Sequence, residues 1–442
     1  MKKLKDNREI KKSEHFNFLQ SNLFKRVANK TLKHLKESEN FIIFPGDIDT
    51  KEDDKKFIFR IVDDKAWTGN IVGWLADNET KININSRFSS DDNDDYFLHY
   101  LILKNMKYSV NNQMISSDVN YEYYNILLFL FPYFLNQALK KGLYKKYIAN
   151  NYNDHSFRGI INFVEHIKTN LPFNGKIAYQ TRDFSYENDL NMLIRHTIEK
   201  IQKTNNKSIL TNNLENIKNI NLIKTITPNY SAKDLNLILN KNIKNKLKHR
   251  FFVEYADLQE LCIHILTNKK TSYGLAKRKI NGIIIDIAIL WENYIASITT
   301  NVLKHLKYKE SWIYLFNKDS KNQITNGERK IYPDFILDNR IPIDAKYKET
   351  ISKRDDYYQL ISYLHVLGDE EHLGELSAYF IKPNLQNSGI EKIGELKGLG
   401  GSLYTYNFFI PKCDSFDDFK NQMEKEEHKL VTHLQQLIGD DD

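Results

Sequence analysis

The sequence has few cysteines and no long apolar run, and these two absences exclude several classes of protein. Only Cys262 and Cys413 are present among 442 residues, too few for a disulfide framework or a cysteine zinc site. The longest apolar run, residues 126–135, is interrupted by Pro132 and is shorter than a helix that crosses a bilayer. We therefore expect a protein of a reducing compartment with no membrane segment.

Two further absences concern targeting and nucleotide hydrolysis. Residues 1–12 are charged, and no apolar segment of a secretory signal follows them. The sequence contains no Gly-x-x-x-x-Gly-Lys-[Ser/Thr] loop, because its nearest candidate, residues 389–394, is followed by Glu395 instead of lysine. We predict a cytoplasmic protein whose associated nucleotide hydrolysis, if any, belongs to another chain.

The charge of the chain allows an anionic partner without requiring one. The formal net charge is +7, and residues 200–250 are rich in lysine and poor in acids. A second basic cluster consists of Lys269, Lys270, Lys277, Arg278 and Lys279. Such clusters suit phosphate contacts that hold a DNA duplex without reading its bases, but they are also ordinary solvated helix faces. We predict that the second cluster binds DNA, with the solvated face as the alternative.

Residues 329–348 have the pattern of a tight hairpin that carries an acid and a base on one face. Two short apolar runs flank residues 338–340, where Asp and Asn tolerate turn geometry. Alternation along the second strand places Asp344 and Lys346 on the same face. Asp334, at the start of the first strand, is near enough across the hairpin to join them. The pattern therefore predicts three ionisable groups at one place.

These three groups have the chemistry of a magnesium-dependent site. Two carboxylates on rigid strands, Asp334 and Asp344, can hold Mg²⁺ while waters and a substrate phosphate complete its coordination. The metal would make a nucleophile from water and neutralise charge on the phosphate. Lys346 would orient that water or offset negative charge in the transition state. The alternative is a surface hairpin with a solvated ion pair.

The spacing of these residues resembles a nuclease signature. Pro333-Asp334, nine further residues and then Asp344-Ala345-Lys346 match the PD-(D/E)xK pattern. Many nucleases of this class carry a further acid on the helix before the hairpin. Glu292 matches it, within an apolar-rich helix predicted over residues 283–298. The alternatives are a boundary glutamate in water and Asp286, which lies nearer the helix start, where acids are favoured.

A second polar pair follows the hairpin. Gln359 and Tyr363 are four residues apart in a predicted helix and so share one face. Some members of the same nuclease class have a Gln-x-x-x-Tyr pair that supports the site, and the resemblance assigns these two residues that role. A plain amphipathic helix with a polar edge explains them equally well.

The chain as a whole is predicted to be α/β, or α+β overall, with four segments. We expect a disordered basic tail over residues 1–15, a strand-rich N-terminal domain over 16–118, a helical middle domain over 119–250, and a nuclease domain with a mixed sheet flanked by helices over 251–442. The predicted elements are helices over 19–35, 121–147, 189–201 and from 416 onward, and strands over 41–44, 57–62, 70–75, 81–85, 376–383 and 403–410. Since the N-terminal domain shows no catalytic constellation, a partner-docking role is favoured.

Several segments occur in the order found in one family. Residues 141–147, 157–161 and 187–191, followed by 290–295, 332–334 and 343–348, resemble McrC, the nuclease subunit of McrBC-type restriction systems. The resemblance covers roughly residues 121–363. It implies a metal-dependent DNA endonuclease of an anti-phage system that works with a GTP-hydrolysing, McrB-like AAA+ ring and stimulates it through the N-terminal domain. It implies DNA, and no small molecule, as substrate.

Two other functions remain open. The chain could be a nuclease-fold subunit that binds DNA and activates an AAA+ motor without cutting, or a stand-alone DNA repair nuclease. Mg²⁺ dependence of strand scission separates the first from an endonuclease subunit, and cutting without a partner would favour the second.

Overall fold

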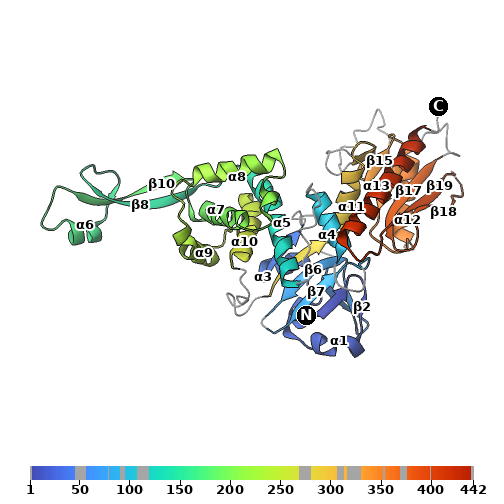
Figure 1. Cartoon of the computed structure of the whole chain (residues 1–442), viewed down its shortest axis with the longest axis horizontal. Coiled ribbons are helices and arrows are strands. Elements are labelled where there is room, and N and C mark those ends of the chain that lie inside the picture. Colours follow the sequence, from blue (N-terminus) through green and yellow to red (C-terminus); the bar gives the residue numbers. More distant parts are fainter. Residues whose placement is uncertain are drawn as a thin grey trace, which may run out of the picture. The chain divides into compact units, whose positions relative to one another are not determined.

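The chain forms two compact units in the computed structural model. The described residues are 2–44, 56–77, 79–89, 95–106, 119–267, 280–305, 313–315, 330–351, 354–368, 376–398 and 400–439. Residues 1–117 and 276–442 make the first unit, and residues 118–275 make the second (Figure 1). The second unit is therefore an insertion in the first. The mixed α/β class is confirmed, but the predicted boundaries differ: the expected N-terminal and nuclease domains share one unit, and residues 251–267 belong to the other.

The N-terminal part of the first unit contains a five-stranded sheet in the described residues. Its order is β1 (Lys2–Lys5), β7 (Lys81–Asn85), β6 (Ile71–Ala76), β11 (Asn281–Asp286) and β3 (Asn40–Phe44). Strand β1 pairs parallel with β7, β6 lies antiparallel to both β7 and β11, and β11 pairs parallel with β3. The prediction of a disordered tail over residues 1–15 is wrong, because β1 completes one edge of this sheet and buries Leu4.

Strand β11 corrects a second prediction. The helix expected over residues 283–298 begins only at Ile287, and the isoleucines before it form the strand. Ile283, Ile284 and Ile285 are all buried, as in a strand covered on both faces, where β-branched side chains pack well. A central strand of the N-terminal sheet therefore comes from the second half of the chain.

Short helices and a small sheet surround this region. They are α1 (Lys12–Leu19), α2 (Asn22–Val27), α3 (Leu32–Ser38) and the strands β2 (Glu9–Ile10), β5 (Lys65–Thr68) and β4 (Phe59–Val62), with α4 (Tyr96–Asn105) following. The single helix predicted over residues 19–35 is wrong. Ser21 and Thr31 each accept a hydrogen bond from a backbone N–H three residues later, so they cap new helices where a continuous one was expected.

The C-terminal part of the first unit is a six-stranded mixed sheet flanked by helices, within the described residues. Its order is β12 (Leu303–His305), β15 (Phe335–Leu337), β16 (Ile341–Ala345), β17 (Ser377–Asn384), β19 (Ser402–Phe409) and β18 (Gly389–Glu395), and the helices are α11 (Ile287–Ile298), α12 (Arg354–Leu367) and α13 (Phe416–Gly439). Leu403 packs with α12, whereas Phe408, five residues on, contacts Trp291 of α11. Because side chains alternate along a strand, these two helices cover opposite faces. A short pair, β13 (Ile313–Tyr314) and β14 (Lys330–Ile331), lies outside this sheet.

The predicted hairpin is present. Strands β15 and β16 are antiparallel, and Leu337 faces Ile341 across the turn. Asp338 and Asn339 have φ angles of 49° and 56°, in the left-handed region that Asp and Asn tolerate better than most residues. The turn therefore fixes the register of the two strands that carry the candidate site.

The second unit is a helical bundle with a long arm, whose described strands form a three-stranded sheet (Figure 1). The bundle contains α5 (Val119–Lys140), α7 (Asp189–Gln202), α8 (Leu214–Ile226), α9 (Leu235–Lys244) and α10 (Val253–Thr267), with short 3-10 segments at Lys207–Leu210, Ala232–Asp234 and Arg250–Phe252. The arm consists of β8 (Lys146–Asp154), β9 (Ile160–Ile161), α6 (Phe163–Thr169) and β10 (Ile177–Ser185). Helix α5 continues through Pro132, where a kink or break was predicted, and ends at Lys140 instead of residue 147. No helix in the described part of the chain is long and apolar enough to cross a membrane.

We predict that Gly73→Ala destabilises the first unit. Gly73 lies in β6 with φ +133°, and an added Cβ would stand 2.1 Å from the carbonyl oxygen of Ile283 in β11. The free energy of unfolding should fall by roughly 2–3 kcal/mol, measured from urea unfolding curves. Gly394→Ala is the matched control, since a Cβ in that strand meets nothing within 4 Å, and its effect should stay within about 0.5 kcal/mol. Equal shifts for the two variants would contradict this account of the β6–β11 contact.

Candidate functional site

The hairpin brings three of the predicted site residues together. Asp334 directly precedes β15, and its Oδ2 accepts a hydrogen bond of 2.9 Å from the backbone N–H of Ala345. Asp344 is buried in β16, and its Oδ2 lies 2.7 Å from Nζ of Lys346. Asp334 and Asp344 are also close enough for each to influence the pKa of the other. The three groups thus meet where the second strand ends.

Glu292 joins this cluster from α11. The helix begins at Ile287 because the Asp286 carboxylate accepts hydrogen bonds from the N–H groups of Ala288 and Ile289. Asp286 therefore serves as the helix cap, and it also forms an ion pair of 2.8 Å with Lys56. Glu292, almost two turns later, is buried and contributes to the electrostatic environment of Asp334. Of the two candidate acids, the structure brings Glu292 to the site.

A histidine that the sequence did not single out contacts Glu292. Nε2 of His305 in β12 lies 3.2 Å from Oε1 of Glu292, and both side chains are buried. Nothing in the spacing of His305 marks it as a site residue, because its contact depends on the pairing of β12 with β15. This histidine helps to hold the Glu292 carboxylate in its place.

The electrostatics of the cluster follow from burial and like charge. Burial raises the pKa of Asp334 well above its usual range, and the nearby charges of Asp344 and Glu292 raise that pKa further. Burial also raises the pKa of Asp344, although the Lys346 ammonium opposes the shift. Burial would lower the pKa of Lys346, but the Asp344 and Asp334 carboxylates outweigh it and raise that pKa. Perturbed carboxyls around one ammonium group are typical of a functional site.

Gln359 and Tyr363 lie beside the lysine as predicted. Lys346 Nζ donates to Gln359 Oε1 at 3.2 Å, and Gln359 Nε2 donates to the Tyr363 hydroxyl at 2.9 Å. The Tyr363 hydroxyl donates in turn to the backbone carbonyl of Tyr332 at 3.2 Å, two residues before Asp334. The Lys346 ammonium is thereby linked through α12 to the start of the hairpin.

The donor set of the site fits a hard cation. Among the described residues, no group of three or more His, Cys, Asp and Glu side chains is arranged to hold a metal ion. Mg²⁺ is commonly bound by one or two carboxylates, with waters and substrate phosphates as its other ligands. Half-buried Asp334 and buried Asp344 supply two such carboxylates, and the pair therefore fits Mg²⁺ better than a metal that needs a complete protein cage.

Lys269, Lys270, Lys277, Arg278 and Lys279 fall outside the described residues.

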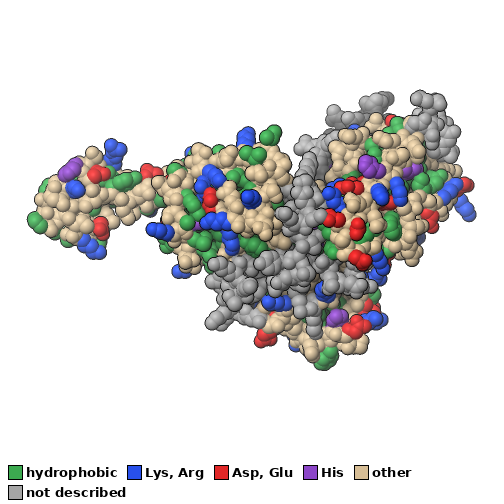
Figure 2. Space-filling model, viewed as in Figure 1, with side chains coloured by type: hydrophobic (Ala, Val, Ile, Leu, Met, Phe, Trp, Pro, Cys, Tyr) green, Lys and Arg blue, Asp and Glu red, His purple; other side chains and the backbone are tan. Residues whose placement is uncertain are grey.

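The lysine-rich segment from 200 to 250 lies in the bundle of the second unit. Figure 2 shows Lys and Arg side chains on the displayed face of this bundle. Lys241 pairs with Asp189 at 3.0 Å and Lys246 with Glu260 at 2.7 Å. Part of this basic surface is therefore neutralised by acids of neighbouring helices.

We predict that Asp334→Asn raises the stability of the first unit when divalent ions are absent. The folded-state pKa of Asp334 lies above the ordinary carboxyl value of 3.8, so its protonation favours the fold at low pH, and this contribution is lost as the pH rises. An asparagine keeps an oxygen to accept from Ala345 and needs no proton to face Asp344. The gain should be on the order of 1 kcal/mol at neutral pH and shrink toward pH 4, as measured by thermal unfolding.

The matched control for this variant is Asp338→Asn in the same hairpin. Asp338 is exposed and already in a conformation that asparagine tolerates, so its stability should not change with pH in the same way. An Asp334→Asn protein that is less stable than the parent across this pH range would contradict the crowding of charge described above.

Comparison with known proteins gives a family match and distant structural neighbours. A family described as "McrBC 5-methylcytosine restriction system component" matches residues 66–374. No curated protein matches the chain. Two solved structures of Thermococcus gammatolerans proteins are each 14% identical in sequence to the chain. The first, the refined half-complex of McrB AAA+ hexamers with bound McrC, has a TM-score of 0.40, and the match covers 96% of this chain and 99% of the matched chain. The second, the McrBC complex, has a TM-score of 0.29 and covers 68% of this chain and 87% of its own. Because the family match spans more than half of its length, the chain belongs to the McrBC family of 5-methylcytosine restriction system components.

Proposed function

We propose that the chain is the DNA-cleaving subunit of an McrBC-type restriction system, a Mg²⁺-dependent endonuclease of the PD-(D/E)xK class. The observation that supports this proposal is the meeting of Asp334, Asp344, Glu292 and Lys346 at one place, where Asp344 and Glu292 are buried. Each of the four was selected from sequence for the same chemistry, and they come from one hairpin and the helix before it. A solvated surface ion pair, the alternative, would leave Asp344 exposed, and it is buried.

The side chains of the site have separate tasks in phosphodiester hydrolysis. Asp334 and Asp344 would hold Mg²⁺, which supplies an activated water and neutralises phosphate charge when bound. In the reaction a water oxygen forms a bond to phosphorus and the water loses a proton to solvent, while the bond from phosphorus to one ester oxygen breaks and that oxygen takes up a proton. Lys346, held between Asp344 and Gln359, orients the attacking water and offsets charge on the phosphate. His305 holds Glu292, which would support the metal or its water.

We predict that Asp344→Asn and Lys346→Ala abolish DNA cutting and leave assembly with the AAA+ partner intact. The first change removes a charged ligand, and the second removes the ammonium group that faces it. Cutting should fall by roughly 100-fold or more, measured as the initial rate of strand scission with partner, GTP and Mg²⁺. Removal of Mg²⁺ with a chelator should have the same effect on the parent protein.

Lys304→Ala in β12 is the control for loss of a lysine, since Lys304 is exposed and takes no part in the described site. It should cut at the parental rate. If Asp344→Asn and Lys346→Ala also cut at that rate, the site is wrong. If scission in the parent is absent with every divalent ion, the subunit activates a motor without cutting. If the parent cuts fully without partner and GTP, the stand-alone repair nuclease is supported instead.

We further propose that the arm of the second unit docks on the AAA+ GTPase partner and stimulates its GTP hydrolysis. The far end of the arm exposes seven apolar side chains: Phe157, Ile160, Phe163, Val164, Ile167, Leu171 and Phe173. Ile160 is 75% exposed, and Figure 2 shows hydrophobic side chains at this end of the arm. Apolar residues gathered on the surface of one protein mark a site for another. In McrBC systems the second protein would be the McrB-like ring.

The sequence had favoured the N-terminal domain for docking, and that role stays a prediction. The described N-terminal residues also expose apolar side chains, at Phe16, Ile61, Val62 and Trp67. Their exposures are mostly smaller than those at the end of the arm, and strands β4 and β5 pack on the same core as the five-stranded sheet. The arm is therefore the better candidate for the main contact with the ring.

We predict that the double variant Ile160→Glu, Phe163→Glu weakens binding to the AAA+ partner by roughly 100-fold and loses stimulation of GTP hydrolysis. Both side chains are exposed, so the fold should not suffer. Affinity is measured by titration of labelled partner, and GTP hydrolysis by phosphate release. Trp67→Thr is the comparison variant and should bind like the parent. The opposite result, in which only Trp67→Thr fails to bind, would assign docking to the N-terminal domain.

A further inference from the structure

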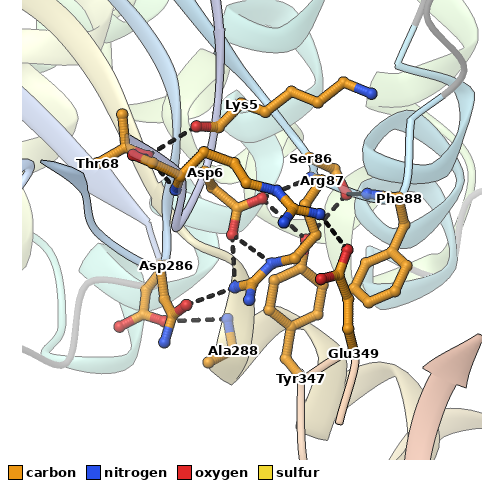
Figure 3. Close-up of polar contacts among 12 residues, drawn as sticks. Lys5, Asp6, Thr68, Ser86, Arg87, Phe88, Asp286, Ala288, Tyr347 and Glu349 are labelled. Atoms are coloured by element: carbon orange, nitrogen blue, oxygen red, sulfur yellow. Dashed lines mark hydrogen bonds and ion pairs between the residues drawn. The ribbon is translucent and has the colours of Figure 1, made fainter. Parts of the chain in front are cut away.

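The residue after Lys346 belongs to a buried polar cluster with Asp6, Ser86 and Arg87 (Figure 3). Tyr347 is 3% exposed, and its hydroxyl donates to Asp6 Oδ1 at 3.3 Å. The Ser86 hydroxyl lies 2.8 Å from the Tyr347 hydroxyl oxygen. Because the Tyr347 proton goes to Asp6, Ser86 is the donor in this second contact. Asp6 and Ser86 directly follow strands β1 and β7 of the N-terminal sheet. The backbone that carries Lys346 is thus tied to that sheet through one side chain.

The other members of the cluster hold Asp6 and the tyrosine ring. Arg87 donates to Asp6 Oδ2 from Nε at 3.0 Å and from Nη2 at 2.7 Å, and its backbone N–H donates to Oδ1 at 2.5 Å. Its guanidinium carbon stands 4.6 Å from the centre of the Tyr347 ring, and the Phe88 ring meets that ring edge-on at 5.2 Å. Asp6 and Arg87 are both buried. The phenol is therefore fixed at its hydroxyl and on its faces.

A buried ion pair of this kind adds little net stability. Two charges withdrawn from water lose hydration that their attraction only partly replaces, and well-packed apolar residues of similar volume are often as stabilising. What the pair supplies is a defined geometry, because each carboxylate oxygen and guanidinium donor accepts only certain partners. This distinction favours a role in positioning the Tyr347 segment over one in general stability.

Successive residues from 346 to 349 contact, in turn, the C-terminal and the N-terminal part of the first unit. Lys346 and Lys348 bind acids of the nuclease half: Lys348 Nζ contacts both oxygens of Asp356 in α12, at 2.7 and 2.5 Å. Tyr347 and Glu349 instead bind the N-terminal half, since Glu349 pairs with Arg8. The Arg8 pair is exposed and so contributes little by itself. The Tyr347 contact is the buried one, and it adjoins the lysine of the site.

We infer that Asp6, Arg87 and Tyr347 are positioning residues for Lys346, through which the N-terminal sheet controls the rate of DNA cleavage. This inference rests on the proposed endonuclease function. Lys346 and Tyr347 are consecutive, so a shift of the tyrosine moves the backbone of the lysine. Displacement of a catalytic group by about 1 Å can reduce a rate by roughly 100-fold. The cluster therefore acts on the step that Lys346 assists, without touching the substrate.

Tyr347→Phe tests this inference with the smallest change available. The variant keeps the ring, its packing against Phe88 and its contact with Arg87, and loses only the hydroxyl that meets Asp6 and Ser86. We expect kcat for strand scission to fall by about 10-fold, with the KM for DNA and the stimulated GTP hydrolysis of the partner unchanged. The measurement uses the full chain with its AAA+ partner, GTP and Mg²⁺.

Tyr100→Phe is the matched control. It removes a buried tyrosine hydroxyl of the same unit, which donates to Glu427 at 2.7 Å and makes no contact with the segment of Lys346. Both variants should lower the melting temperature by a few degrees, but Tyr100→Phe should keep the parental kcat. A role that is only structural would make the two variants alike.

A double-mutant cycle locates the effect. Ser86→Ala removes the donor to the Tyr347 hydroxyl, so the double variant Ser86→Ala, Tyr347→Phe should lose no more kcat than the more affected single variant. Parental kcat in Tyr347→Phe, equal loss in Tyr100→Phe, or additive losses in the cycle would each overturn the inference while the proposed function stands. A parent protein that does not cut DNA would overturn the proposed function, and this inference with it.

Discussion

Three carboxyl groups lie within electrostatic reach of one another in this protein, and the ammonium group of Lys346 lies among them. Burial and mutual repulsion raise the pKa of Asp334 and disfavour its ionised form. Such an arrangement destabilises the unit that holds it, so the surrounding elements must fix each group strongly enough to prevent rearrangement. The first unit meets that requirement, because the elements that carry the charged groups are held by contacts with neighbouring elements.

The N-terminal sheet takes part in this solution from two directions. Strand β11 pairs with both β6 and β3 and continues directly into α11, so Glu292 lies six residues beyond a strand in the middle of that sheet. Tyr347 connects the same sheet to the neighbour of Lys346 through Asp6 and Ser86. The segments that carry Glu292 and Lys346 are thus both attached to the N-terminal sheet. The predicted division into a docking domain and a nuclease domain missed this, because it assigned the two halves separate cores.

The local features of the site could be predicted from sequence because each depends on neighbouring residues. Alternation along one strand placed Asp344 and Lys346 together and Tyr347 on the other side, and the Asp338-Asn339 turn set the register. A spacing of four residues joined Gln359 to Tyr363. The missed features depend on contacts between distant segments. His305 reaches Glu292 only through the pairing of β12 with β15, and β1 is ordered only because β7 lies beside it.

The two connections to the N-terminal sheet, through β11 and through Tyr347, depend on different kinds of residues. The β11 ladder is made of backbone hydrogen bonds and requires small residues where strands approach closely: an added Cβ at Gly73 or Gly282 would stand 2.1 or 2.3 Å from a carbonyl oxygen of the facing strand. The isoleucines and the glycine of β11 do not indicate which strands they pair with, and the sequence therefore predicted a helix there. The Tyr347 connection is made of side chains from Asp6, Ser86 and Arg87, and no periodicity links those positions to the hairpin. The first connection fixes where α11 begins and therefore where Glu292 stands. The second leaves the backbone pairing of β16 unchanged and acts only beyond its end, where Lys346 lies, so the two connections constrain different groups of the same site.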